Sequence, residues 1–169
     1  MCSPKNQTFK TNKMKTLLII CLLLITIQGN STSGQRGETL CSIQNRKVSK
    51  FFNSIWNEAR RINEETGVPM AIIMGMSALE TGFCKSRRCT QDCNYFSVKR
   101  NHSYCIYNSK LDSFTDFAKV VEKSCYLNLQ PVTLVDWYEA LECCGYAESK
   151  QYVRKLNFII FKYNLDKVV

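Results

Sequence analysis

The stretch PMAIIMGMSALETG, residues 69–82, is an apolar run bounded by two residues that mark helix ends. Pro69 suits the first position of a helix, and Gly82 suits the position just past its end. Because almost every side chain between them is apolar, the pattern predicts a buried helix. One charged residue, Glu80, lies in the last turn of that helix.

Glu80 shares a helix face with apolar side chains. It follows Ile72 and Met76 at a spacing of four residues, so the three side chains project in the same direction. Partial burial favours the neutral form of a carboxyl group and raises its pKa. A general acid in glycoside cleavage needs this property, because it must still hold a proton near neutral pH. The alternative is that Glu80 turns out to solvent and has no chemical role.

Helical spacing of apolar residues continues on both sides of this run. A helix is predicted from Ser42 to about Gly67, with one buried face formed by Phe51, Phe52, Ile55, Trp56, Ala59 and Ile62. Another is predicted from Ser113, where the sequence SFTD resembles a helix cap, with a face formed by Phe114, Phe117, Ala118 and Val121. Two more are predicted at 133–144 and 149–164, the last carrying Tyr152, Leu156, Ile159, Ile160 and Tyr163.

Residues 83–112 lack helical periodicity and are rich in Cys, Arg, Asn, Tyr and Ser. Two short alternations within them, NYFSVK and YCIY, are predicted to pair as a small hairpin across RNHS. The fold class is therefore α+β, mostly α, with a small β-hairpin lobe. The length of 169 residues fits one domain with a hydrophobic core.

The N-terminal region has the pattern of an export signal. Lysines precede the apolar run LLIICLLLITI, which is followed by small and polar residues. We therefore predict a secretory signal peptide at 1–29, a flexible leader at 30–41 and one folded domain at 42–169. A membrane anchor would need about 20 apolar residues, more than this run supplies, and the bulky Ile20 disfavours a lipoprotein site at Cys21.

Removal of residues 1–29 leaves eight of the ten cysteines. In an exported chain an even number predicts disulfides, here up to four, with the pairs left open. The candidates are Cys41, Cys84, Cys89, Cys93, Cys105, Cys125, Cys143 and Cys144. The close spacing of Cys84, Cys89 and Cys93 admits a zinc site as the alternative, but the chain has a single histidine, His102. We expect no metal and no cofactor.

The net charge is +9 for the whole chain. Residues 1–29 contain four lysines and no acid, so the remainder carries 19 basic and 14 acidic residues, or +5. Such a surface suits anionic partners such as cell walls, membranes or nucleic acid. The alternative is that the excess charge belongs to an ordinary soluble surface without a specific partner.

Four motifs occur in order along the chain: MGMSALETGFC, CNYFSVK, DSFTDFAKVV and WYEALECCGYAESKQYVRKLNFIIFKYNL. Together they resemble the glucosaminidase branch of the lysozyme superfamily, glycoside hydrolase family 73, over roughly residues 45–167. The resemblance implies a lysozyme-like helical domain that cleaves β-1,4 bonds of N-acetylglucosamine-containing glycan, with bacterial peptidoglycan as the expected substrate. It implies a polysaccharide partner rather than nucleic acid. From the export signal and the short apolar run we expect an extracellular location and no stable membrane anchor, and we expect a monomer.

The resemblance also assigns roles to individual residues. Glu80 matches the family's catalytic acid, and Tyr146 matches a tyrosine that lies near it. The residues assigned to substrate binding are Asn94, Phe96, Lys99 and Tyr152. Without the resemblance, core packing would explain Phe96 and Tyr146, and a turn would explain Asn94.

One feature departs from the family pattern. A second carboxylate commonly follows the position of Lys99, yet residues 100–111 contain no acid, and Asp92 and Asp112 lie outside the expected hairpin. Either the substrate's 2-acetamido group replaces the missing acid, or the protein binds glycan without cutting it. A third possibility is a cationic protein that damages membranes, although no strongly basic amphipathic helix is evident.

Overall fold

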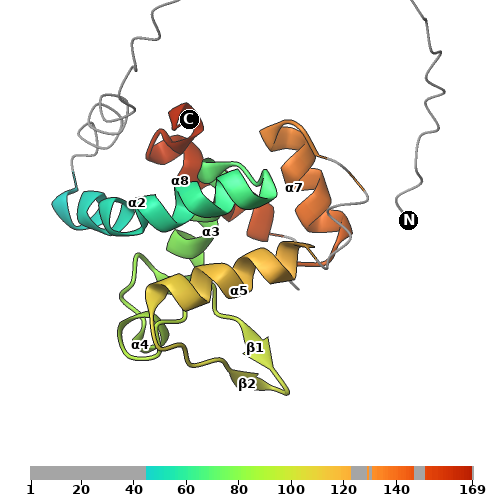
Figure 1. Ribbon diagram of the computed structural model, residues 1–169. Helices are drawn as coiled ribbons and strands as arrows, with labels where there is room; N and C mark the ends of the chain where they lie inside the picture. The colour runs from blue at the N-terminus through green and yellow to red at the C-terminus, as the bar shows by residue number, and fades with distance from the viewer. Residues whose placement is uncertain (1–44, 123–128, 130, 147–150, 169) are drawn as a thin grey trace, which may run out of the picture.

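The computed structural model describes residues 45–122, 129, 131–146 and 151–168. The elements are helix α2 (Arg46–Thr66), α3 (Met70–Thr81), α4 (Arg87–Thr90), strands β1 (Lys99–Arg100) and β2 (Ser103–Tyr104), α5 (Lys110–Glu122), α7 (Leu134–Cys143), α8 (Tyr152–Lys162) and the 3₁₀ helix η1 (Leu165–Lys167). Figure 1 shows the hairpin and α4 on one side of α5, with α2, α3, α7 and α8 on the other. The predicted α+β class, mostly helical with a small hairpin, is confirmed.

Helix α3 forms the centre of the core, as its sequence predicts. It packs against α2, α8 and η1, and all its residues are buried except Leu79 and Glu80, which are partly exposed. Gly75 permits the close approach of α8: a Cβ atom at this position would lie 2.8 Å from Leu156 Cδ1 and 3.0 Å from Ile160 Cγ1. The helix ends at Gly82, whose φ of 59° favours glycine.

The long helix α2 covers one side of α3. Its N-cap is Asn45, whose side-chain oxygen accepts hydrogen bonds from the amides of Lys47 and Val48. The predicted stop at Gly67 is confirmed, with a φ of 73°. All six residues of the predicted apolar face are buried, and α2 also packs against α5.

The predicted hairpin exists but is shorter than expected. Lys99 pairs with Tyr104 and Arg100 pairs with Ser103 in antiparallel register. Asn101 and His102 form the turn with φ values of 49° and 65°, so the lone histidine lies in an exposed turn, as predicted. The short helix α4 is absent from the sequence prediction, because four residues are too few to show a period.

Helix α5 begins earlier than predicted. Ser113 lies inside it rather than at its start, and the Ser109 hydroxyl accepts from the amide of Asp112 in the first turn. The Ser113 hydroxyl instead accepts from the amide of Tyr95, at 2.9 Å. The predicted cap was therefore wrong, because a contact between distant segments uses this serine. The predicted buried face of the helix is correct.

The two C-terminal helices occur close to their predicted positions. Helix α7 follows Thr133, which forms a capping box with Asp136. Helix α8 spans Tyr152–Lys162, while the predicted start at Ser149 lies outside the described residues. No helix in the described parts of the chain has the length and hydropathy needed to cross a membrane.

The disulfide prediction is correct in part. Cys84 is bonded to Cys89, and Cys143 and Cys144 are also disulfide-bonded. Cys93 and Cys105 are free thiols, so these two of the eight candidates do not form a disulfide. The Cys105 side chain has another polar partner, the Tyr107 hydroxyl. Cys41 and Cys125 lie outside the described residues, as do the predicted signal peptide and leader.

The Cys84–Cys89 bond also bears on the zinc alternative. It consumes two of the three thiolates that such a site would use. Among the described residues, no group of three His, Cys, Asp or Glu side chains is placed to hold a metal ion.

Candidate active site

A cleft of about 510 Å³ opens between the end of α3 and the hairpin lobe. Its walls come from four parts of the fold. Glu80 comes from α3, Ser97, Val98, Lys99 and Tyr104 from the hairpin region, Val120 from α5, and Cys144 and Tyr146 from the segment after α7, with Phe96 at its base. The cleft thus collects residues far apart in sequence around one carboxyl group.

The Glu80 carboxyl is the centre of this site. Burial raises its pKa above the ordinary value of 4.5, and this effect exceeds the opposing effects of the Tyr152 and Ser97 hydroxyls and the charge of Arg88. The Ser97 hydroxyl donates to the backbone carbonyl of Glu80 at 3.1 Å, which ties the hairpin lobe to the end of α3. A cleft-facing carboxyl with a raised pKa can act as a proton donor.

Two tyrosines accompany the acid. Tyr146 lines the cleft and follows Gly145, whose φ is 62°. Its ring lies 5.6 Å from that of Tyr152, centroid to centroid, and the Tyr152 hydroxyl interacts with Glu80. The structure thus brings together Glu80, Tyr146 and Tyr152, three residues that the sequence assigned to one site.

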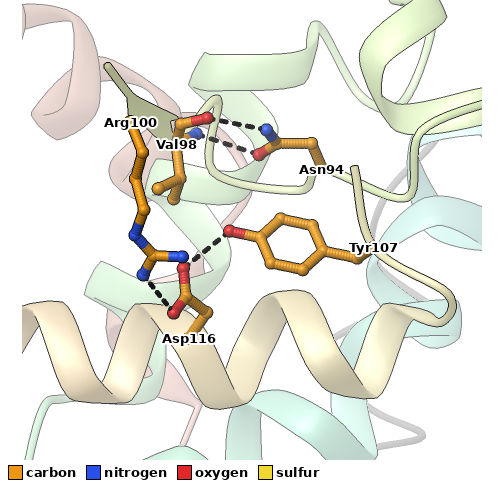
Figure 2. Close-up of polar contacts among 5 residues, drawn as sticks. All are labelled: Asn94, Val98, Arg100, Tyr107 and Asp116. Atoms are coloured by element: carbon orange, nitrogen blue, oxygen red, sulfur yellow. Dashed lines mark hydrogen bonds and ion pairs between the residues drawn. The ribbon is translucent and has the colours of Figure 1, made fainter. Parts of the chain in front are cut away.

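Asn94 lies in the interior instead of on the cleft wall. It has no exposed surface, and its side-chain amide donates to the backbone oxygen of Cys105 at 2.9 Å. The amide also donates to the backbone oxygen of Val98 at 2.9 Å, and its Oδ1 accepts from the Val98 amide (Figure 2). A side chain without exposed surface cannot contact a glycan in this conformation. Its predicted role in substrate binding is therefore replaced by a structural one, in which it holds the base of the hairpin.

Phe96 is likewise mostly a core residue. It is 2% exposed, its ring stacks on Phe117 at 4.0 Å, and it meets the edge of Phe114 at 4.9 Å. It forms the base of the cleft, where it shapes the cavity more than it offers a surface to a sugar. The expected substrate residue Lys99, in contrast, is exposed at the cleft.

A network of polar side chains fixes the hairpin to α5. Asp116 accepts hydrogen bonds from Arg100 at 2.5 Å and from the Tyr107 hydroxyl at 2.7 Å (Figure 2). Burial would raise the pKa of Asp116, but its hydrogen bonds to Tyr107 and Arg100 and the charges of Arg100 and Lys119 lower it overall. Asp116 is therefore ionised, and its carboxylate accepts hydrogen bonds from Arg100 and Tyr107.

The second carboxylate of the family pattern has no counterpart in the described cleft wall. Glu80 is the only acid among the residues that line it, and neither Asp92 nor Asp112 is among them. Asp116 is engaged in the network with the hairpin. The sequence raised this question, and the geometry of the described residues leaves Glu80 as the only acid of the cleft.

Several residues of the site were missed at the sequence level. Ser97, Tyr104 and Val120 line the cleft, and Arg88 acts on Glu80 through its charge. The pairing of Lys99 with Tyr104 could have indicated Tyr104, since the two lie opposite each other across the predicted turn. Arg88 gave no signal, because its position depends on α4.

Comparison with known proteins identifies the fold and the family. The glucosaminidase family model, described as mannosyl-glycoprotein endo-beta-N-acetylglucosaminidase, matches residues 56–165. The sequence matches no curated protein.

Three solved structures share the fold. The catalytic domain of the autolysin Auto from Listeria monocytogenes is 21% identical, with a TM-score of 0.63, over 79% of this chain and 94% of that one. The glycoside hydrolase domain of FlgJ from Salmonella typhimurium is 23% identical, with a TM-score of 0.58, over 69% and 88%. A peptidoglycan hydrolase mutant from Sphingomonas sp. A1 is 25% identical, with a TM-score of 0.60, over 70% and 96%.

The matched segment contains Glu80, the hairpin lobe, Tyr146 and Tyr152. It spans more than half of the chain, and the lysozyme-like architecture that the motifs predict is the architecture observed. The protein belongs to the glucosaminidase family, glycoside hydrolase family 73.

Proposed function

We propose that the protein is a glycosidase that cleaves β-1,4 bonds in an N-acetylglucosamine-containing glycan, with Glu80 as the general acid. The observation that carries this proposal is the partly buried Glu80 carboxyl, with its raised pKa, in a cleft large enough for sugar units. Family membership supports glycosidase activity. The named activities of the solved relatives, an autolysin and a peptidoglycan hydrolase, support peptidoglycan as the substrate.

The reaction uses one protein carboxyl group. Glu80 gives its proton to the glycosidic oxygen while the bond from that oxygen to the anomeric carbon breaks. The carbonyl oxygen of the sugar's 2-acetamido group bonds to the anomeric carbon, giving a cyclic oxazolinium ion. Water then adds to this carbon, the ring reopens, and a proton returns to Glu80. This route fits a cleft whose described wall holds no second acid.

The N-terminal sequence supports a proposal about where the protein acts. We propose that residues 1–29 direct export and are removed, that the mature protein acts outside the cell as a monomer, and that its positive charge of +5 retains it on anionic cell wall. These segments lie outside the described residues.

The decisive experiment is release of reducing ends from purified peptidoglycan by the oxidatively folded mature chain. We expect release across the acidic to neutral range, and a loss of about 10²- to 10⁴-fold in Glu80→Gln, the usual contribution of a general acid. The control is Glu139→Gln, which changes an exposed glutamate on α7. Equal activity in Glu80→Gln and the parent would refute the assignment of Glu80.

The role of the 2-acetamido group has its own test. Peptidoglycan from which the N-acetyl groups have been removed lacks the internal nucleophile, so we expect its cleavage to fall by at least the same order as in Glu80→Gln. Full activity on the deacetylated wall would show that water attacks directly.

The presence of one carboxylate, Glu80, among the described residues of the cleft also favours a second candidate, a protein that binds glycan without cleaving it. This candidate predicts that the folded parent chain pellets with peptidoglycan and releases no reducing ends. It also predicts equal binding by the parent and by Glu80→Gln. Cleavage by the parent chain excludes it.

A further inference from the structure

Two positive charges lie against a single aromatic ring that lines the cleft. The guanidinium carbon of Arg88 lies 4.1 Å from the centroid of the Tyr104 ring, and the Lys99 ammonium lies 4.7 Å from the same centroid. Tyr104 and Lys99 line the cleft. Arg88 is not among the lining residues, but it packs on the Tyr104 ring and its charge lowers the pKa of Glu80. We call these three residues the cationic wall.

The charges of the cationic wall have no direct carboxylate partner among the described residues. None of the ion pairs among the described residues includes Arg88 or Lys99. The Nε atom of Arg88 is buried and has no hydrogen-bond acceptor within the described part of the chain. Glu80, the one acid of the described cleft wall, has its neutral form favoured by burial. Because the Nε atom is buried, an acceptor from outside the protein would pair with the exposed Lys99 ammonium and with the exposed part of the Arg88 guanidinium.

The donor groups of the cationic wall, a guanidinium and an ammonium, determine which kind of acceptor binds there. A guanidinium group offers paired donors that match a carboxylate, and stacking on Tyr104 restricts its orientation before a ligand arrives. The ammonium of Lys99 adds a second charge from the neighbouring strand. A neutral sugar hydroxyl would leave both charges uncompensated.

We propose that the cationic wall is a subsite for a carboxylate carried by the glycan, on the sugar next to the bond that is cut. In peptidoglycan fragments this group is the lactyl carboxylate of muramic acid, or a stem-peptide carboxylate where a peptide is attached. The inference rests on the proposed function and deepens it. The cationic wall makes the cleft prefer carboxylate-bearing glycan to neutral chitin-like chains.

A ligand bound at this subsite also changes the pKa of Glu80. The charge of Arg88 lowers the pKa of Glu80, against the larger effect of burial. A bound carboxylate offsets that charge, so the pKa of Glu80 rises further when the correct substrate is present. Recognition of the substrate anion therefore favours the protonated acid.

The test compares two ligands that differ only in charge. Binding of a tetrasaccharide of alternating N-acetylglucosamine and N-acetylmuramic acid, without peptide, is measured by calorimetry, beside the same compound with its lactyl carboxyls reduced to alcohols. Both ligands lack the phosphate of wall teichoic acids, so a response to the carboxylate is separated from binding of phosphate. Glu80→Gln serves as the parent, which removes turnover.

We expect Arg88→Gln and Lys99→Gln each to lose about 10-fold or more in affinity for the charged ligand, the size of a charge-assisted hydrogen bond. Affinity for the reduced ligand should change less than about 3-fold. Arg88→Lys should retain part of the preference. The matched control, Lys50→Gln, removes an exposed charge on α2 and should alter neither affinity.

Three results would overturn the inference. Equal losses on both ligands would give Arg88 and Lys99 a structural role, and unchanged affinities would give them none. Equal binding of the two ligands by the parent would refute the preference while leaving the proposed hydrolase intact if the wild-type chain still cleaves. Preferential binding of the charged ligand without cleavage by the wild type would support the subsite and refute the hydrolase.

Discussion

At the scale of single residues, the raised pKa of Glu80 makes the stability of the fold depend on pH. Its pKa in the folded chain lies above the ordinary value of 4.5, so the folded state holds this proton more tightly than the unfolded state does. The stabilising effect of that proton is complete below pH 4.5 and is lost as the pH rises through the folded value. Ionisation of this carboxyl as the pH rises therefore costs stability.

Glu80→Gln should consequently be more stable than the parent at pH 7, by on the order of 1 kcal/mol, as is usual when a functional residue is neutralised. The difference should vanish below about pH 4. Urea unfolding at several pH values measures it, and Glu139→Gln serves as the exposed comparison. A variant that is less stable at pH 7 would mean that the Tyr152 and Ser97 hydroxyls outweigh burial.

At the scale of secondary structure, the hairpin depends on its attachment to α5. The lowered pKa of Asp116 means that its contribution to stability is present above the ordinary value of 3.8 and is lost as the pH falls through the folded value. Asp116→Asn should cost about 1.5 to 3 kcal/mol at pH 7, the range for hydrogen bonds to charged groups. This cost should shrink below pH 3.8.

Hydrogen exchange locates the effect of Asp116→Asn. The amide of Cys105, which donates to the Val98 carbonyl in the hairpin, should lose protection, while the amides of α2 should not. Asp112→Asn, an exposed change on the same helix, is the control. Uniform loss of protection would assign Asp116 to global stability instead of to the hairpin.

The packing of α3 against α8 gives a second prediction at this scale. Gly75→Ala gains about 1 kcal/mol in helix propensity but places a methyl group 2.8 Å from Leu156. Overpacking of this kind costs about 1 to 3 kcal/mol. We expect a net loss in thermal unfolding, partly recovered by the added change Leu156→Val. A net gain would mean that α8 shifts without cost.

Sequence pattern predicted most of the helices, because a buried helix face leaves a period of three to four residues, as on α2 and α5. It missed α4, which is too short for a period, and it misassigned Ser113, whose hydroxyl bonds to Tyr95, 18 positions away. Glu80 was found because its apolar neighbours lie on its own helix. Tyr104 was missed although the predicted hairpin places it opposite Lys99. Arg88 was missed because its contact with Tyr104 exists only after the hairpin and α4 have formed.

At the scale of the whole molecule, the excess of positive charge predicts salt-dependent binding to cell wall. Raising NaCl from about 0.05 to 0.5 M shortens the screening length, so we expect cosedimentation with intact wall to fall several-fold. Affinity for the reduced, uncharged tetrasaccharide should not change. If binding to intact wall and binding to the reduced tetrasaccharide both persist at high salt, contacts in the cleft, and not net charge, retain the protein on the wall.

The direction in which α3 runs also contributes to the acid. Backbone dipoles leave the C-terminal end of a helix partly negative, and this end is where Glu80 lies. The last turn of α3 contains no basic residue to offset that pole. A negative pole disfavours a second negative charge, so it acts with burial to keep the carboxyl protonated. The same glutamate in the first turn of α3 would face the positive pole and ionise more readily, so the orientation of the central helix is itself part of the acid chemistry.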